Sequence, residues 1–216
     1  MSACDISLLQ PHLLKIEKYF PCLLSSYLIW HCVSVKTHQV SATTKNLPLI
    51  AMTNKEFFKA CLTNELDATA NVIAALNSDK LDYRPHPTNR SAYEIAEHII
   101  AHAYDFQVIL TQDACDECLV MPFKNSQDGS QLLRQYWEKA IALVDAMDED
   151  AFNTVNVELL VSGKSFVTIP RVSMMWFFFF DIIHHRGQLS TYIRPMGGKN
   201  PAVYGYSFDS LQENNS

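Results

Sequence analysis

Residues 172–188 read VSMMWFFFFDIIHHRGQ and form the most informative stretch of the 216-residue chain. The stretch is apolar on all sides as far as Ile183, so a helix formed from it must be buried on more than one face. Pro170 precedes it, and Gly197 and Gly198 follow it. Proline commonly stands at the start of a helix and glycine just after its end. A long, buried final helix of this kind is typical of a helical bundle.

Three further helices are predicted upstream of this stretch, because apolar residues recur there at three- and four-residue spacing. They are expected over about residues 54–77, 91–111 and 130–147. Thr53 with Glu56, and Ser91 with Glu94, have the spacing of capping boxes that begin the first two helices. The long connection before the third helix is long enough to cross along the bundle instead of forming a tight turn.

A small β-hairpin is predicted between the third and the last helix. Residues 155–159 and 165–169 alternate in character around Ser162-Gly163-Lys164. Alternation of this kind around a short glycine-containing turn is typical of two antiparallel strands. The expected fold is therefore all-α, a four-helix bundle with a small β-hairpin before the last helix.

The first 51 residues do not share this helical pattern. Residues 20–35 are mostly apolar, but this segment is shorter than the roughly 20 residues that cross a bilayer. Met52 directly precedes the first capping box, and we interpret it as the natural start. We expect a poorly structured N-terminal extension over residues 1–51, the bundle over residues 52–210 and a flexible tail over residues 211–216.

The composition excludes some classes of partner. The net charge of −6 disfavours nucleic acid, because phosphate binding depends on clustered lysine and arginine. The six cysteines have no spacing typical of a disulfide framework, and Cys115 with Cys118 forms only a lone CxxC, at best half of a zinc site. We expect a reduced, cytoplasmic protein without a membrane or nucleic-acid partner.

Two pairs of polar residues within apolar helices suggest a metal site. Asp181 and His185 are four residues apart and project from the same side of the last helix, and His98 and His102 have the same spacing on the second helix. Two such pairs can hold a cation between them, and imidazole and carboxylate donors suit zinc, nickel, iron or manganese. In the alternative, each histidine bonds a backbone carbonyl and Asp181 pairs with Arg186.

The sequence resembles the DinB-like (DinB/YfiT) superfamily, whose members are metal-binding four-helix bundles. The resemblance lies in three segments: residues 91–98 (SAYEIAEH), 184–189 (HHRGQL) and 196–205 (MGGKNPAVYG). It extends over about residues 53–209 and implies the same fold.

The resemblance also implies a ligand set. His98 and His185 stand at the family's ligand positions. The family commonly has His-x-x-x-His before Arg-Gly-Gln, and here Asp181 replaces the earlier of these histidines. Asp181 is therefore implied as the third ligand, with His184 as the alternative. No residue is assigned to an organic cofactor.

Three functions are consistent with this resemblance. One is a metal-dependent transferase of the thiol S-transferase type, which uses a low-molecular-weight thiol and orients an anionic small-molecule substrate through Arg186 and Tyr204, unless both are structural. Another is a metal-dependent hydrolase in which His184 or His102 acts as the base. The third is a stress-related, non-catalytic metal- or ligand-binding protein. We expect a homodimer, because one bundle rarely buries all sides of a helix.

Overall fold

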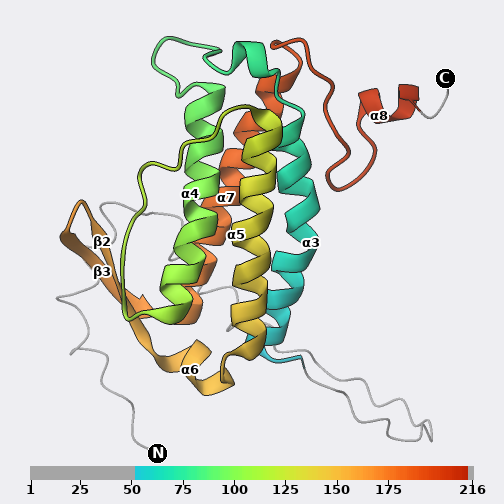
Figure 1. Ribbon diagram of the computed structural model, residues 1–216. Coiled ribbons are helices and arrows are strands. Elements are labelled where there is room, and N and C mark those ends of the chain that lie inside the picture. The colour runs from blue at the N-terminus through green and yellow to red at the C-terminus, as the bar shows by residue number, and fades with distance from the viewer. Residues whose placement is uncertain (1–51, 214–216) are drawn as a thin grey trace, which may run out of the picture. The chain divides into compact units, whose positions relative to one another are not determined.

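Four long helices form the body of the molecule, as the sequence predicts (Figure 1). The computed structural model describes residues 52–213, and the expected N-terminal extension and the last three residues lie outside the described residues. The four helices are α3 (Asn54–Ala74), α4 (Ala92–Thr111), α5 (Ser126–Ala146) and α7 (Arg171–Ile193). In this part of the chain, no helix has both the length and the apolar character needed to cross a membrane.

One long crossover makes two consecutive helices of the bundle, α4 and α5, run in the same direction. Helices α3 and α7 run in one direction, and α4 and α5 run in the other (Figure 1). The connection between α4 and α5 therefore returns along the length of the bundle, which confirms the predicted route. Helix α5 packs against both α3 and α4, and α4 packs against α7. The histidine pair of α4 is thereby placed beside the Asp181 region of α7.

Local sequence signals account for where the helices begin. Both predicted capping boxes are present, at Thr53 for α3 and at Ser91 for α4. Helix α5 begins four residues before the expected position, because the Asn125 side chain accepts a hydrogen bond from the backbone of Asp128 and caps it. Gly129 then lies inside the helix instead of in the loop. A Cβ at this glycine would come within 2.9 Å of the Phe123 ring.

The predicted hairpin is present and belongs to a slightly larger sheet. Strands β2 (Asn156–Val161) and β3 (Lys164–Pro170) pair antiparallel, and Ser162 and Gly163 between them have φ values of 53° and 73°. Positive φ at both positions is typical of a two-residue hairpin turn. A third strand, β1 (Ala114–Asp116), pairs parallel with β2 and was not predicted. The short helix α6 (Glu149–Thr154) was also not predicted.

The core lies between the four helices and is rich in aromatic side chains. Trp137 is fully buried, and its indole N–H donates to the Leu62 carbonyl over 3.0 Å. Phe178 and Phe179 are buried, but Phe180 is 62% exposed. Successive helical residues point about 100° apart, so a run of four phenylalanines cannot face one core.

The C-terminal segment ends in α8 (Phe208–Glu213), which spans the boundary expected at residue 210. The Asp209 carboxylate accepts hydrogen bonds from the Asn200 backbone over 2.8 Å and from the Arg194 guanidinium over 3.0 Å. These contacts join the segment to the residues that directly follow α7.

Candidate metal centre

Three histidines surround one carboxylate oxygen where α4 packs against α7. Oδ2 of Asp181 accepts hydrogen bonds from Nε2 of His98 and from Nε2 of His102, each over 3.1 Å. Nε2 of His185 lies 3.3 Å from the same oxygen. His98, Asp181 and His185, the three residues proposed from the sequence as ligands, therefore lie in one cluster. We call these three residues together with His102 the His–Asp cluster.

The His–Asp cluster is mostly shielded from water but not closed. The side chain of His102 is 5% exposed, those of His98 and His185 are 14% exposed, and that of Asp181 is 35% exposed. Burial opposes ionisation of Asp181, but the hydrogen bonds from His102, His185 and His98 outweigh it. They hold the pKa of the Asp181 carboxyl far below its usual range. The cluster thus presents an ionised oxygen among three imidazoles.

A second carboxylate, that of the fully buried Asp105, holds His102 of the cluster in place. Oδ2 of Asp105 accepts a hydrogen bond from Nδ1 of His102 over 3.2 Å, and Asp105 also accepts from the Cys118 backbone N–H over 3.1 Å. Burial lowers the pKa of His102, but its hydrogen bonds to Asp105 and Asp181 outweigh burial and raise it. For His98, burial is the larger effect and lowers the pKa. Asp105 thus fixes the direction in which His102 points.

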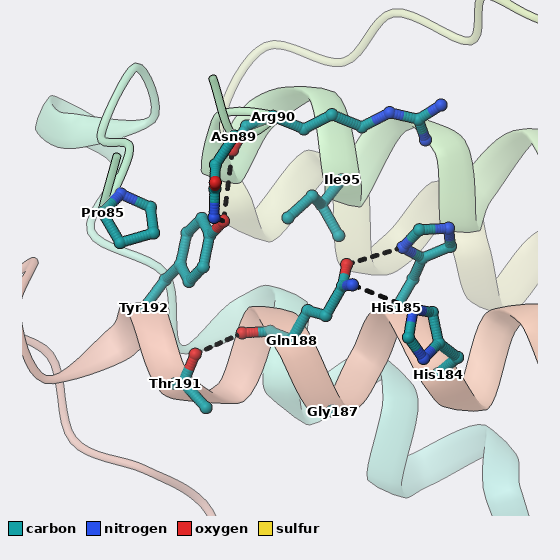
Figure 2. Close-up of a pocket in the computed structure, with 10 residues that line it drawn as sticks. All are labelled: Pro85, Asn89, Arg90, Ile95, His184, His185, Gly187, Gln188, Thr191 and Tyr192. Atoms are coloured by element: carbon teal, nitrogen blue, oxygen red, sulfur yellow. Dashed lines mark hydrogen bonds between the residues drawn. The ribbon is translucent and has the colours of Figure 1, made fainter. Parts of the chain in front are cut away.

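Gln188 contacts both of the neighbouring histidines of α7 through its side-chain amide (Figure 2). Its Oε1 accepts from Nδ1 of His185 over 2.9 Å, and its amide nitrogen lies 2.9 Å from Nε2 of His184. With the proton on Nδ1, His185 can present the lone pair of Nε2 to a cation. His184 is exposed and does not face Asp181. Between the two alternatives for the third ligand, Asp181 lies in the cluster and His184 lies outside it.

Glu117 adds a further carboxylate that the sequence did not predict. An oxygen of Glu117 and one ring nitrogen each of His98 and His102 all lie within 4.8 Å of one another. Glu117 directly follows β1, whose pairing with β2 places it beside α4. Burial raises the pKa of the Glu117 carboxyl.

Two clefts adjoin the cluster. The first cleft has a volume of about 730 Å³ and is lined by His185, His184 and Gln188 among others (Figure 2). The second cleft has a volume of about 440 Å³, and His98 and Glu117 contribute to its wall. A small molecule can therefore approach the cluster from solvent through either cleft.

The other candidates from the sequence lie away from the clefts. Arg186 is buried, forms an ion pair with Glu65 and donates a hydrogen bond to Thr69 over 3.2 Å. It also donates to the hydroxyl of Tyr204. Arg186 faces α3 instead of Asp181, so the ion pair considered from the sequence is not formed. The structure brings Arg186 and Tyr204 together, and their contacts support the structural alternative.

The CxxC cysteines have no place among the donor groups found in residues 52–213. Both Cys115 and Cys118 are free thiols, and burial raises the pKa of each. A raised pKa keeps a thiol protonated at neutral pH and so disfavours metal binding or nucleophilic attack.

Two residues that support the cluster have positions that sequence spacing can identify. Asp105 follows His102 by three residues, and Gln188 follows His185 by three, so each lies on the same helical face as the histidine that it contacts. No comparable signal exists for Glu117, since it lies in the crossover connection, where no periodicity indicates direction.

The comparison with known families agrees with the fold. A family model described as the DinB family matches residues 52–216. This chain belongs to the DinB family. The predicted DinB-like resemblance is therefore confirmed.

Individual DinB relatives are distant in sequence. The uncharacterized protein YjoA of Bacillus subtilis (strain 168) is 23% identical over 142 residues, which cover 61% of this chain and 83% of YjoA. The crystal structure of YjoA, described as a DinB-like protein, has a TM-score of 0.55 at 18% identity and covers 70% of this chain and 99% of that one. A DinB-like protein from Bacillus cereus ATCC 10987 has a TM-score of 0.55 at 17% identity, with 69% and 97% covered. At these identities the likeness shows the DinB fold alone.

Proposed function

We propose that this DinB-family chain binds a divalent metal ion through His98, Asp181 and His185 and uses it in catalysis. The observation that carries the proposal is the convergence of imidazole nitrogens on one oxygen of Asp181, at 3.1 to 3.3 Å. Two donors that each lie about 2.1 Å from one ion are roughly 3.0–3.4 Å apart for angles between 90° and 109°. The nitrogens of His98 and His185 therefore each lie at such a separation from Oδ2 of Asp181, and the three donor atoms all lie within 4.8 Å of one another.

His102 has a supporting role in this proposal. Both of its ring nitrogens face carboxylates, Nδ1 towards Asp105 and Nε2 towards Asp181. Ligating carboxylates are commonly held by hydrogen bonds from outer residues. With His102 holding Asp181, three protein ligands remain, and a tetrahedral zinc ion keeps one position open. If His102 were itself a ligand, four donors would close a tetrahedral site, which favours the non-catalytic alternative.

The reaction that we favour is transfer involving a low-molecular-weight thiol, in accordance with the resemblance in sequence. A bound divalent ion lowers the pKa of a thiol or a water molecule that occupies its open position. Gln188 keeps the proton of His185 on Nδ1, and Asp105 keeps His102 directed at Asp181. The clefts admit the reactants to His185 on one side of the cluster and to His98 on the other.

Glu117 supports a second candidate, a metal-dependent hydrolase. Its carboxylate lies within 4.8 Å of the His98 and His102 nitrogens and faces the second cleft. A carboxylate beside the open side of a metal site can accept a proton from an attacking water. Glu117 is better placed for this role than His184, which is hydrogen-bonded to Gln188.

We also propose a cytoplasmic homodimer. Three exposed or half-buried aromatic residues, Phe57, Trp176 and Phe180, lie in contact on α3 and α7, with the Trp176 and Phe180 rings 5.3 Å apart. A second copy that covers this patch would bury the outer face of α7. The free cysteines of the described region agree with a reducing compartment.

The ligand set is tested with two neighbouring histidines. We expect wild-type protein dialysed against zinc to retain about one zinc per chain by elemental analysis, and His185→Ala to lose most of it. His184→Ala is the matched control and should retain the metal, because His184 lies outside the cluster. Equal metal content in all three proteins would refute the ligand assignment.

The open position is tested with cobalt in place of zinc. Addition of 2-mercaptoethanol to the cobalt(II) protein should produce thiolate-to-cobalt charge-transfer absorption in the near ultraviolet. An unchanged spectrum in a protein that binds one cobalt would indicate a closed site and would favour the non-catalytic alternative.

A further inference from the structure

The two clefts beside the His–Asp cluster differ sharply in charge. Among the residues that line the first cleft there is no aspartate or glutamate, and Arg90 is the permanently charged side chain. The second cleft is lined by three carboxylates, those of Glu94, Glu97 and Glu117, together with Arg84 and Arg90. The first cleft therefore favours an anion, whereas the carboxylates of the second disfavour one.

Arg90 is available to bind a ligand. Its backbone carbonyl accepts a hydrogen bond from the Tyr192 hydroxyl over 3.2 Å. In the described part of the chain, its guanidinium has no hydrogen bond or ion pair, although its positive charge acts on Glu117 and His98, which line the second cleft together with Arg90. Arg84 differs, since both of its terminal nitrogens are bound to Glu94, at 2.8 and 3.0 Å. Figure 2 shows the Arg90 side chain extended on the opposite side of the first cleft from His184 and Gln188.

Gly187 keeps the α7 side of the same cleft open. Glycine is among the poorest helix formers, and here it lies inside a long helix. A Cβ added at Gly187 would meet no atom within 4 Å, so packing does not require a glycine at this position. Any larger side chain would extend into the space that the first cleft occupies. The absence of a side chain thus leaves room for a bound molecule.

We propose that the first cleft binds a small organic carboxylate whose acidic group pairs with Arg90 and whose other end lies beside His185. A guanidinium matches the two oxygens of a carboxylate in a bidentate pair, and one fixed positive charge balances one negative charge. The link to His185 rests on the proposed metal function, whereas the pairing with Arg90 does not. The inference assigns an anionic substrate class to the site and replaces Arg186 by Arg90 as the residue that recognises it.

Binding to Arg90 is tested on the full-length, metal-free protein, so the result does not depend on the proposed function. Propionate is titrated into isotope-labelled protein, and two-dimensional NMR follows the side-chain amide of Gln188 and the backbone amide of Gly187. Both signals should shift with propionate and remain unchanged with propionamide, which has the same shape without the charge. Arg90→Gln should weaken propionate binding about tenfold. Arg84→Gln, the matched control, should bind propionate like the wild type.

Several outcomes would overturn the inference. These are equal shifts with propionamide, equal binding by Arg90→Gln, or equal losses in Arg90→Gln and Arg84→Gln. Tighter binding of inorganic phosphate than of propionate would overturn the carboxylate assignment. Gly187→Leu, a helix-compatible substitution, should weaken propionate binding by occupying part of the cleft. Propionate binding at wild-type affinity in this variant would show that propionate does not bind in the first cleft.

The link to the metal is tested with the cobalt(II) protein and two thiols, 3-mercaptopropionate and 2-mercaptoethanol. Arg90→Gln should weaken binding of the first about tenfold and leave that of the second unchanged. Equal effects on both thiols would refute the link between Arg90 and the metal-bound end of the ligand. Absence of any spectral change with either thiol would refute the proposed function. Binding of propionate to Arg90, which is measured without metal, would not be affected by that result.

Discussion

Replacement of Asp105 by asparagine tests whether the buried carboxylate behind the cluster controls metal binding. Asp105→Asn preserves the size and shape of a fully buried side chain and removes its charge. The side chain contacts His102 Nδ1 at 3.2 Å and the Cys118 backbone N–H at 3.1 Å. The asparagine oxygen can still accept one of these bonds, so we expect the fold to survive.

The size of the effect follows from the contact with His102. A hydrogen bond to a charged group contributes about 1.5–3 kcal/mol, and a neutral one about 0.5–1.5 kcal/mol. The hydrogen bond to His102 should therefore lose roughly 1–1.5 kcal/mol of its free energy. If this loss appears in metal binding, the dissociation constant for the metal increases about tenfold. Changes to such outer residues commonly weaken metal affinity by about 10–100-fold. Removal of the Asp105 charge should also lower the pKa of His102.

The assay is competition for zinc with a chromophoric chelator at fixed pH, with the His102 pKa followed by NMR in the metal-free protein. Asp67→Asn is the control, because this aspartate is on α3 with a side chain that is 78% exposed. The control should bind zinc like the wild type. Wild-type zinc affinity in Asp105→Asn, together with a lowered His102 pKa, would show that orientation of His102 does not contribute to the site.

Three further predictions concern stability. Gly187→Ala should stabilise the fold by about 1 kcal/mol, since alanine is the better helix former, and should raise the melting temperature by roughly 2–4 °C. Gly198→Ala should lower it in the same calorimetric assay, because the new Cβ would lie 2.7 Å from the Ala75 carbonyl oxygen. A hydrogen bond from Arg84 lowers the pKa of Glu94 from its ordinary value of 4.5 to about 2. The ion pair therefore stabilises the fold above pH 4.5, and this stabilisation is lost as the pH falls towards 2. Because the pair is exposed, Glu94→Gln should lower the free energy of unfolding in urea by only about 0.5 kcal/mol at pH 7 and should not change it near pH 2. The same difference between variant and wild type at both pH values would contradict this assignment.

The helices could be predicted where the signals are local. Thr53 and Ser91 each begin a helix through contacts within four residues, and both were predicted correctly. The start of α5 was misplaced because Gly129 was interpreted as a loop residue. The true start is the Asn125 cap, a local signal that was overlooked, and the Phe123 ring lies against Gly129 inside the helix. Strand β1 was missed for a different reason, because its partner β2 is distant in sequence and the strand is only three residues long.

The same distinction applies to the candidate site. His98, Asp181 and His185 lie on helices, where spacing determines the face on which a side chain lies. Arg90 and Glu117 come from the segments just before α4 and just after β1. Their directions depend on how the chain enters and leaves these elements, so sequence spacing cannot predict them. The helical residues that we propose as metal ligands are thus the more predictable part of the site, and the residues that would select a substrate are the less predictable part.

The departure of Asp181 from the pattern that the resemblance implies has a physical consequence. A carboxylate has lone pairs for several N–H donors, whereas a neutral imidazole can accept only one hydrogen bond. Oδ2 of Asp181 is within 3.3 Å of three imidazoles, a contact set that a histidine at this position could not satisfy. Metal binding must displace the hydrogen-bonded proton from Nε2 of His98, because a ligating nitrogen has to be unprotonated. Asp181 stabilises the protonated form of the cluster, which competes with the metal-bound form. Metal affinity should therefore fall as the pH decreases.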